Sequence, residues 1–270
     1  MASEPASSVT ITPVALHDAK VFIQFPWRVY RGDHLWVPPL LLERKAFLNP
    51  RKNPFFQHAQ VQLFLARQGT ETVGRIAAVV NTAHDQFHHE HAGFFGLFEC
   101  LPEAANAATA LVQAAETWVR ERGATFLRGP VNLSMNALDC GLLVEGFGAA
   151  PVFQSSYNPP YYADFLEASG LQKCKDVLAF YRHYHPWPAP RILRLVERLE
   201  ARRHLTVRPI NMRDFQAEVL RIVAIYNDAW SDNWGFVPIT EAEARHMAQD
   251  LRLAIIPQLA LLAELDGEVV

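Results

Sequence analysis

The side chains best suited to bind a small molecule in this sequence are short polar ones that follow a glycine–proline pair. They are Asn132, Ser134, Asn136 and Asp139. Amide, hydroxyl and carboxylate groups that follow a strand can hydrogen-bond a ligand. The same groups bond their own backbone in turns, so a turn-rich loop stays open as the alternative. If they form a pocket, Asn132→Ala should abolish ligand binding and leave the melting temperature nearly unchanged. A large drop in melting temperature would instead favour the turn.

A second polar group contains several phenols. Its members are Ser155, Tyr157, Asn158, Tyr161 and Tyr162. A phenol can protonate a leaving thiolate, which makes Tyr161 and Tyr162 weak candidates for a general acid. Half-buried tyrosines with locally bonded hydroxyls are the alternative interpretation. No catalytic residue can be assigned from the sequence beyond these two.

Two further candidates, Asn227 and Asn233, flank Trp230 near the end of the chain. Their amides are less easily explained by packing than the aromatic rings of Trp230 and Trp234, for which we expect packing. A fourth group is rich in histidine and contains His84, His88, His89 and His91. It lacks the H-E-x-x-H spacing of a helical zinc site, so we expect a solvated loop and no metal.

Composition excludes several classes of protein. The chain has 270 residues, half of them hydrophobic, and a formal net charge of −3. That charge balance gives no reason to expect a nucleic acid or a membrane as partner. Three widely spaced cysteines indicate reduced thiols, and the first residues do not form a secretory signal, so a cytoplasmic location is expected.

The chain repeats itself at a nearly constant offset. VTITPVALHDA, from Val9, matches LTVRPINMRDF, from Leu205, and the two starts are 196 residues apart. LFLARQGTETVG and LALLAELDGEVV recur in the same order further on. Strand–turn–helix openings look alike in many α/β proteins, which is the alternative. The shared order nevertheless favours a duplication.

The duplication predicts three segments. They are a complete domain over 1–186, a helical linker over 187–204 and the beginning of a second, truncated domain over 205–270. At this offset Val270 corresponds to Gly74, so the second copy stops as its first hairpin begins. Uncovered sheet edges and apolar helix faces would then pack on the first domain or cause self-association.

Hydrophobic periodicity predicts the elements that position these residues. Strands are expected over 9–11, 60–66, 73–80, 93–99, 125–127 and 177–181, and helices over 108–119, 161–169, 191–203 and after Asp18, Asp214 and Thr240. The predicted class is α/β, with a mixed α+β sheet that is mostly antiparallel and flanked by helices.

This order of elements resembles the GNAT superfamily of N-acyltransferases. The local cues are LFLARQGTETVGRIAAVV, GFFGLFEC and YYADFLEASGLQK, and the whole chain resembles tandem GNAT-like proteins. In those proteins RGPVNLSMNALDCGLLVEGF, APVFQSSYNPPYY and YNDAWSDNWGFVPIT are signatures. The resemblance implies acetyl-CoA or another acyl-CoA as co-substrate, and a small-molecule or peptide amine as acceptor.

Two departures from the family pattern affect the expected function. The loop that would hold the cofactor pyrophosphate, residues 101–106, has no glycine and carries Glu103, which would repel a phosphate. Leu166 occupies the position of the family's general-acid tyrosine. We therefore expect an N-acyltransferase whose first domain is degenerate in cofactor binding. The alternative is a GNAT-like protein that binds a ligand or partner without catalysis.

Overall fold

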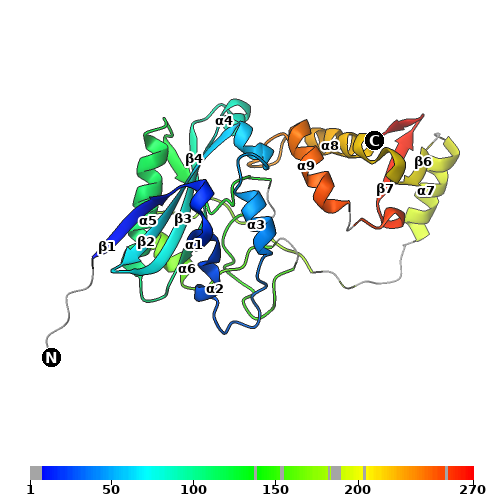
Figure 1. Ribbon diagram of the computed structural model, residues 1–270. Coiled ribbons are helices and arrows are strands. Elements are labelled where there is room, and N and C mark those ends of the chain that lie inside the picture. The colour runs from blue at the N-terminus through cyan, green and yellow to red at the C-terminus, as the bar shows by residue number, and fades with distance from the viewer. Residues whose placement is uncertain are drawn as a thin grey trace. The chain divides into compact units, whose positions relative to one another are not determined.

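The computed structural model describes residues 8–136, 139–152, 155–181, 183, 190–202, 205–252 and 255–270. The chain divides into two compact units (Figure 1). The first comprises Met1–Asp176 with Trp234–Val237, and the second comprises Val177–Asn233 with Pro238–Val270. Among the described residues, no helix combines the length and the hydropathy needed to cross a bilayer.

The first unit is built on a five-stranded sheet. Its strands are β1 (Val9–Val14), β2 (Ala59–Gln68), β3 (Glu71–Asn81), β4 (Ala92–Cys100) and β5 (Phe126–Arg128), paired in that order. All neighbours are antiparallel except β4 and β5, which are parallel over three residues. The predicted mixed, mostly antiparallel sheet is therefore confirmed.

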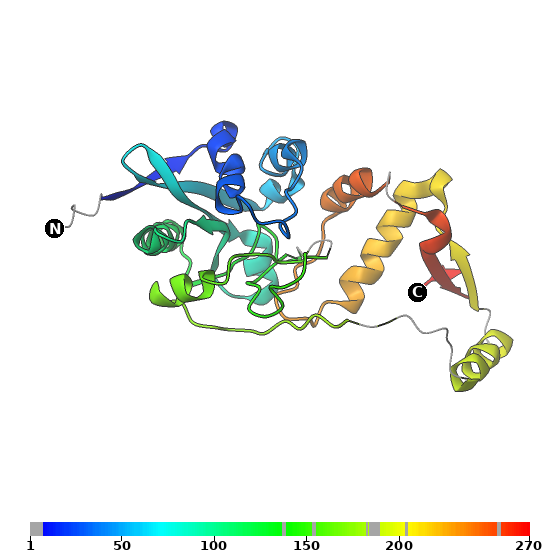
Figure 2. The ribbon, with the colours of Figure 1, turned by 90° about the horizontal axis from the view of Figure 1, so that it is seen from below.

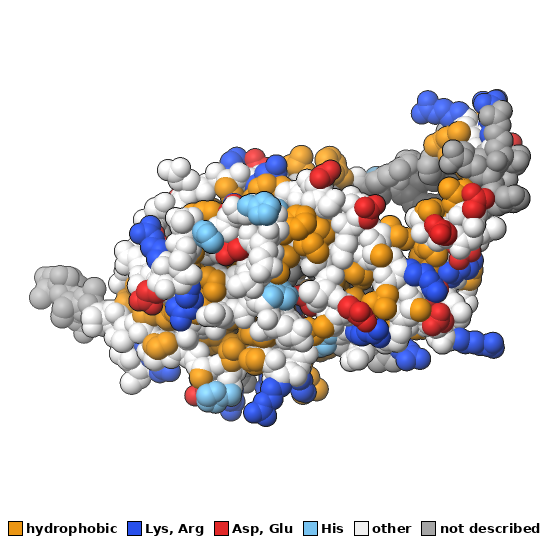
Figure 3. Space-filling view, turned by 90° about the horizontal axis from the view of Figure 1, so that it is seen from above, with side chains coloured by type: hydrophobic (Ala, Val, Ile, Leu, Met, Phe, Trp, Pro, Cys, Tyr) orange, Lys and Arg blue, Asp and Glu red, His pale blue; other side chains and the backbone are white. Residues whose placement is uncertain are grey.

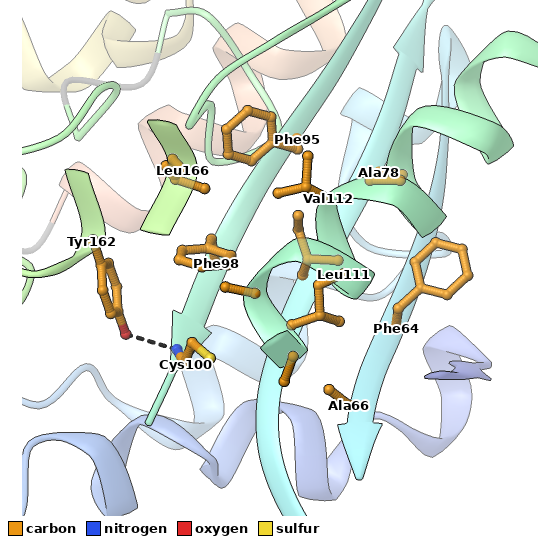
Figure 4. Packing of buried hydrophobic residues seen from close by; sticks show 14 of the residues in the cluster. Phe64, Ala66, Ala78, Phe95, Phe98, Cys100, Leu111, Val112, Tyr162 and Leu166 are labelled. Atoms are coloured by element: carbon orange, nitrogen blue, oxygen red, sulfur yellow. Dashed lines mark hydrogen bonds between the residues drawn. The ribbon is translucent and has the colours of Figure 1, made fainter. Parts of the chain in front are cut away.

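Helices cover both faces of this sheet (Figure 2). One face carries α1 (Lys20–Gln24), α2 (Pro26–Val29) and α3 (Leu41–Phe47), and the other carries α5 (Ala105–Arg120) and α6 (Tyr162–Ala168). On α5, residues Leu111, Ala115 and Val119 are fully buried because they recur every four positions and so share one face. Figure 4 shows this apolar layer, in which Leu111 and Val112 lie among side chains from the strands and α6.

Strand β4 is interrupted where the next loop approaches it. Leu97 has a φ of 48°, and the pairing register with β3 shifts between Arg75 and Ala77. The Val131 amide donates to the Phe95 carbonyl over 2.6 Å. A Cβ on Gly96 would lie 1.9 Å from the carbonyl oxygen of Val131, so only glycine allows this approach. The loop after β5 is thereby fixed against the middle of β4.

The second unit has a smaller sheet with the same opening order. Strands β6 (Leu205–Pro209), β7 (Leu261–Leu265) and β8 (Glu268–Val269) are antiparallel neighbours in that order, as β1, β2 and β3 are. The helices are α7 (Pro190–Arg202), α8 (Phe215–Ala229) and α9 (Glu241–Leu251). This shared order is what a duplication requires, and the domain boundaries given above stay a prediction.

Local expectations were met in part. The capping box of Thr240 and Glu243 is present at the start of α9. Asp18 does not cap α1, since it ends a 3-10 turn, and Asp214 stands at the N-cap of α8 without a side-chain bond. Residues 177–181 form no strand, so that prediction is wrong. The histidine-rich segment, expected as a loop, is the helix α4 (Thr82–His88).

Candidate functional site

A buried carboxyl group lies at the end of β4. The side chain of Glu99 is only 12% exposed. Its Oε2 accepts a 2.6 Å hydrogen bond from the Tyr162 hydroxyl on α6, and its Oε1 lies 3.5 Å from Nη2 of Arg75 on β3. Side chains from β3, β4 and α6 therefore converge at the C-terminal end of β4.

Burial determines the electrostatics of this carboxyl group. Removal from water raises the pKa of Glu99 above its ordinary value, although Arg75 and the Tyr162 hydroxyl oppose the rise. Burial likewise lowers the pKa of Arg75, whose Nη1 donates to the Phe22 carbonyl over 2.7 Å. Nε of Arg75 is buried and has no hydrogen-bond partner among the described residues. The guanidinium is thus held by one backbone oxygen and one distant carboxylate.

Tyrosines surround the same strand end. The Tyr162 hydroxyl also accepts a 2.9 Å bond from the Cys100 amide, the dashed line in Figure 4. The Tyr161 hydroxyl donates to the Cys100 carbonyl over 2.9 Å. Burial raises the pKa of both phenols, and burial and the Glu99 carboxylate raise that of Tyr30, the residue that follows α2. These phenols are therefore neutral hydrogen-bonding groups at any physiological pH.

A fourth phenol, Tyr157, pairs with a neighbouring carboxylate. The Tyr157 hydroxyl donates to Oδ2 of Asp33 over 2.6 Å, and its ring lies 5.9 Å from that of Tyr30. Burial and the bond to Asp33 raise the pKa of Tyr157 to about 12, while the same bond lowers the pKa of Asp33. Of the predicted site residues, Tyr157, Tyr161 and Tyr162 are thus brought close to one strand end.

The predicted polar loop after β5 is bonded within the first unit. Asn132 Oδ1 accepts from the Leu97 amide at the interruption of β4, and its Nδ2 donates to the Asp139 carboxylate over 2.9 Å. Ser134 Oγ accepts from the Asn136 amide. Asn136 Nδ2 donates to the Val237 carbonyl over 2.7 Å. Only the Ser134 bond is a local turn bond, whereas Asn132 and Asn136 bond distant residues. A ligand-binding role for the four residues stays a prediction.

The remaining predicted residues of this unit lie in a neighbouring loop. The buried side chain of Asn158 bonds both the amide and the carbonyl of Leu143, which fixes that loop. Ser155 is half-buried, and its amide donates to the Val152 carbonyl over 3.0 Å. Neither residue is brought to the Glu99 carboxyl by a hydrogen bond among the described residues.

In the second unit the two predicted asparagines differ. Asn227 bonds the amide and the carbonyl of Ile239 over 2.9 and 3.0 Å, so it joins α8 to the segment before α9. Asn233 is exposed, and its amide donates to the Trp230 carbonyl. Trp230 and Trp234 are about half exposed, at 50% and 46%, and so are less buried than the packing interpretation expects.

An open hollow of about 910 Å³ lies in the second unit, and its charges pair with one another. The buried carboxylate of Glu218 accepts from Arg208 over 2.7 Å, and Arg208 also bonds Glu264 over 2.6 Å. These bonds lower the pKa of Glu218. Carboxylates that already hold the available guanidinium are poorly suited to recruit a ligand.

The histidine-rich helix α4 contains a second buried polar cluster. His84 is fully buried, and its Nε2 lies 2.8 Å from Oε1 of Glu90, which also accepts from Arg128 over 3.0 Å. Burial lowers the pKa of His84. His88 Nε2 bonds the Phe236 carbonyl over 2.6 Å. Among the described residues no group of three or more His, Cys, Asp or Glu side chains has the arrangement of a metal site.

The loop expected to be a poor phosphate cradle connects β4 to α5. Ala104 is the N-cap residue of α5 and supplies no capping side chain, and Glu103 is exposed beside it. The first turn of the helix contains no acidic residue. Glu103 is therefore the negative charge nearest in sequence to the positive end of this helix.

Sequence reasoning missed the acidic and basic residues of the strand-end cluster. Glu99 and Arg75 are single charges inside the apolar runs GFFGLFEC and VGRIAAVV. A charge at the centre of a buried strand is costly unless it is paired, so each should have been assigned a partner. Tyr30 lies in an apolar helical stretch and carries no such signal.

Two known proteins are similar to this chain in sequence. The chain is 39% identical over 258 residues to "Bacterial ceramide synthase" of Caulobacter vibrioides, covering 95% of the chain and 66% of that protein. It is 34% identical over 252 residues to "Protein YghO" of Escherichia coli, covering 93% of the chain and 63% of that protein. The chain thus spans slightly less than two thirds of these relatives. No family model matches it.

A solved structure identifies the fold. The tandem GNAT protein from the clavulanic acid biosynthesis pathway, determined without AcCoA, superposes with a TM-score of 0.52 at 14% identity, covering 97% of this chain and 72% of the other. Coverage of both units by one tandem protein agrees with the sheet order described above. The chain is a GNAT-fold protein.

Proposed function

We propose that this chain is an N-acyltransferase that moves an acyl group from an acyl-CoA thioester to an amine. The observation that carries the proposal is the Glu99 carboxyl, buried at the end of β4 with a raised pKa. An amine acceptor is mostly protonated in water, and its nitrogen must lose a proton before it can attack a carbonyl carbon. A carboxylate with a raised pKa is a stronger base than an ordinary one and can take that proton.

The neighbouring phenols form the surroundings of this base. Tyr162 already donates a 2.6 Å hydrogen bond to Glu99. Proton uptake by the carboxylate would therefore rearrange this existing hydrogen bond. Departure of the CoA thiolate requires a proton in return, for which Tyr161 and Tyr162 remain candidates. The thiol of Cys100 is an unsuitable nucleophile, because burial raises its pKa to about 12.

We infer that the acceptor is a long-chain amine. The support is the 39% identity to a protein named for ceramide synthesis, since ceramides carry an acyl group on the nitrogen of a long-chain base. The acyl-CoA donor would dock outside the glycine-free loop of the first unit, because Glu103 opposes a diphosphate at the start of α5. The first unit would then mainly serve the acceptor.

The proposal is tested by turnover. Purified protein is mixed with palmitoyl-CoA and sphinganine, and release of the CoA thiol and formation of the amide are followed. Glu99→Gln should lower kcat at least about 100-fold, as expected for loss of a general base. Glu116→Gln, on the exposed side of α5, is the control and should leave the rate unchanged.

A non-catalytic binding protein is the second candidate. It is favoured by the glycine-free loop between β4 and α5, where the exposed Glu103 opposes the diphosphate of an acyl-CoA. In that case sphinganine raises the melting temperature while no amide forms from any acyl-CoA. Equal turnover by Glu99→Gln and the unmodified protein would reject the proposed role of Glu99 and leave acyl transfer itself standing.

A further inference from the structure

An exposed apolar strip lies between α2 and α3. Residues 37–42 read VPPLLL. Val37, Leu40 and Leu42 are 63%, 77% and 82% exposed, and Leu41 is 39% exposed. Side chains exposed to this degree stand out from the surface and do not line a hollow. Scattered apolar side chains are normal on a protein surface, but four within six residues form a patch.

Basic residues flank the apolar strip in the sequence. Residues 20–52 contain seven Lys or Arg against two Asp or Glu, whereas the whole chain has a formal net charge of −3. Arg28 and Arg44 have ion-pair partners, Glu71 and Glu43. The other five basic side chains of this segment have no ion pair among the described residues. They are Lys20, Arg31, Lys45, Arg51 and Lys52.

The net charge of the whole chain does not reveal this local excess of positive charge. On the face drawn in Figure 3, acidic and basic side chains are interspersed with hydrophobic ones. The expectation that no membrane binds this protein rests on the overall charge, which averages the basic segment with an acidic remainder. A basic segment can act on its own, because charges further apart than about 10 Å are screened in physiological salt.

Aromatic side chains that pack on one another precede the strip in the sequence. Trp36 stacks on Tyr30 at 4.8 Å and meets Trp27 edge-on at 5.3 Å, and both tryptophans are half-buried. Pro38 and Pro39 restrict the backbone between Trp36 and Leu40. The backbone of the strip is therefore already restricted. Inserting its side chains into an apolar environment would not require the loop to become ordered first.

We infer that residues 37–42 and the basic residues beside them dock the first unit onto an anionic lipid bilayer. Leucine side chains enter the headgroup boundary, tryptophans lie at headgroup depth, and the unpaired basic groups meet lipid phosphates. A protein partner would need to cover projecting leucines and cancel the same positive charge, and a bilayer does both. The inference stands on this surface and does not depend on the proposed acyltransferase activity.

Vesicle sedimentation tests the inference. The protein is mixed with vesicles of phosphatidylcholine alone, or of phosphatidylcholine and phosphatidylglycerol in equal parts. We expect binding to the second kind, reduced by high salt. Leu40→Asp combined with Leu42→Asp should weaken it at least about tenfold, and Lys45→Glu about fivefold. Val144→Asp, at an equally exposed valine of the same unit, is the control.

Fluorescence gives a second readout that does not perturb the surface. Leu42→Cys in a Cys174→Ser background can be labelled with a polarity-sensitive dye, since Cys100 is buried and burial raises the pKa of Cys140 to about 12. The dye should shift to the blue on anionic vesicles, and the same dye at Val144→Cys should not. No vesicle binding by the unmodified protein, or equal shifts at both positions, would overturn the inference.

Discussion

The Tyr162 hydroxyl donates to Glu99 Oε2 over 2.6 Å and accepts from the Cys100 amide over 2.9 Å. One phenol on α6 therefore partly offsets the rise that burial causes in the pKa of the carboxyl group, and it also completes the hydrogen bonding of the last residue of β4. Since Tyr162 is fully buried, neither bond can be replaced by water without rearrangement.

Tyr162→Phe should lower the free energy of unfolding by about 1–3 kcal/mol, because it removes one hydrogen bond from a buried amide and one from a buried carboxylate. Urea unfolding of the variant measures this loss. Tyr181→Phe serves as the matched control, since Tyr181 is 84% exposed and should tolerate the change. Equal stability of the two variants would mean that the Tyr162 hydroxyl contributes nothing.

The pH dependence of acyl transfer should reflect the ionisation of the Glu99 carboxyl group. The rate, as kcat/KM, should rise with pH through a value above the ordinary glutamate pKa, because only the ionised carboxylate accepts a proton. The bond from Tyr162 lowers that pKa, so Tyr162→Phe should move the acidic limb to higher pH. An acidic limb that is the same in both proteins would exclude Glu99 as the titrating group.

Folding stability should depend on the protonation of His84. Its pKa in the folded protein is lower than the ordinary value of 6.5, so the unfolded chain binds the proton more readily. The stability that His84 contributes is complete above about pH 6.5 and declines as the pH falls through the window below it. Glu90, whose pKa is also lowered, loses its contribution only below about pH 4.5.

Urea unfolding at pH 7.5 and 5.5 measures this difference. His84→Gln should reduce the change in stability between the two pH values, whereas His17→Gln, at an exposed histidine without a bonded carboxylate among the described residues, should preserve it. A difference that persists in His84→Gln would assign the pH dependence to another group.

Gly96→Ala should destabilise the first unit strongly, by about 2 kcal/mol or more, because the added Cβ would meet the Val131 carbonyl at 1.9 Å and backbone cannot yield cheaply. Gly148→Ala is a close control, since its Cβ meets nothing within 4 Å and its φ is not positive. Thermal unfolding of the two variants compares them directly. Similar melting temperatures would show that the loop after β5 can move away from β4.

Asn132→Ala should lower the melting temperature, because Asn132 bonds the Leu97 amide at a residue with a positive φ and also the Asp139 carboxylate. This is the outcome that the sequence analysis assigned to a turn. Ser134→Ala loses one exchangeable turn bond and should have a smaller effect. A stable Asn132→Ala protein that no longer binds its ligand would restore the pocket interpretation.

Hydrophobic pattern was sufficient to predict most of the first sheet and its main helix. The apolar, β-rich runs of β2 and β3 and the four-residue recurrence on α5 are local patterns, which the sequence displays directly. The strand expected at 177–181 has the same apolar character, but a strand also needs a neighbour that supplies hydrogen bonds. No pattern within five residues reports whether that neighbour exists.

The strand-end cluster was harder to predict for the same reason. Tyr162 was chosen for its phenol, yet its partner Glu99 lies 63 residues away and on another element. The α4 histidines were expected in a loop because polar residues dominate there. In the structure Asn81 caps a short helix, and burial of His84 is compensated by Glu90. Long-range pairings of this kind depend on topology.

The segment Trp234–Val237 belongs to the first unit, although more than fifty residues of the second unit precede it. His88 and Asn136 hold its backbone through the bonds to Phe236 and Val237. During translation, a ribosome that has finished Asp176 has therefore not yet supplied all of the first unit. Strand β6 and helix α8 emerge before the last piece arrives, so α4 and the polar loop must wait for a late and distant part of the nascent chain.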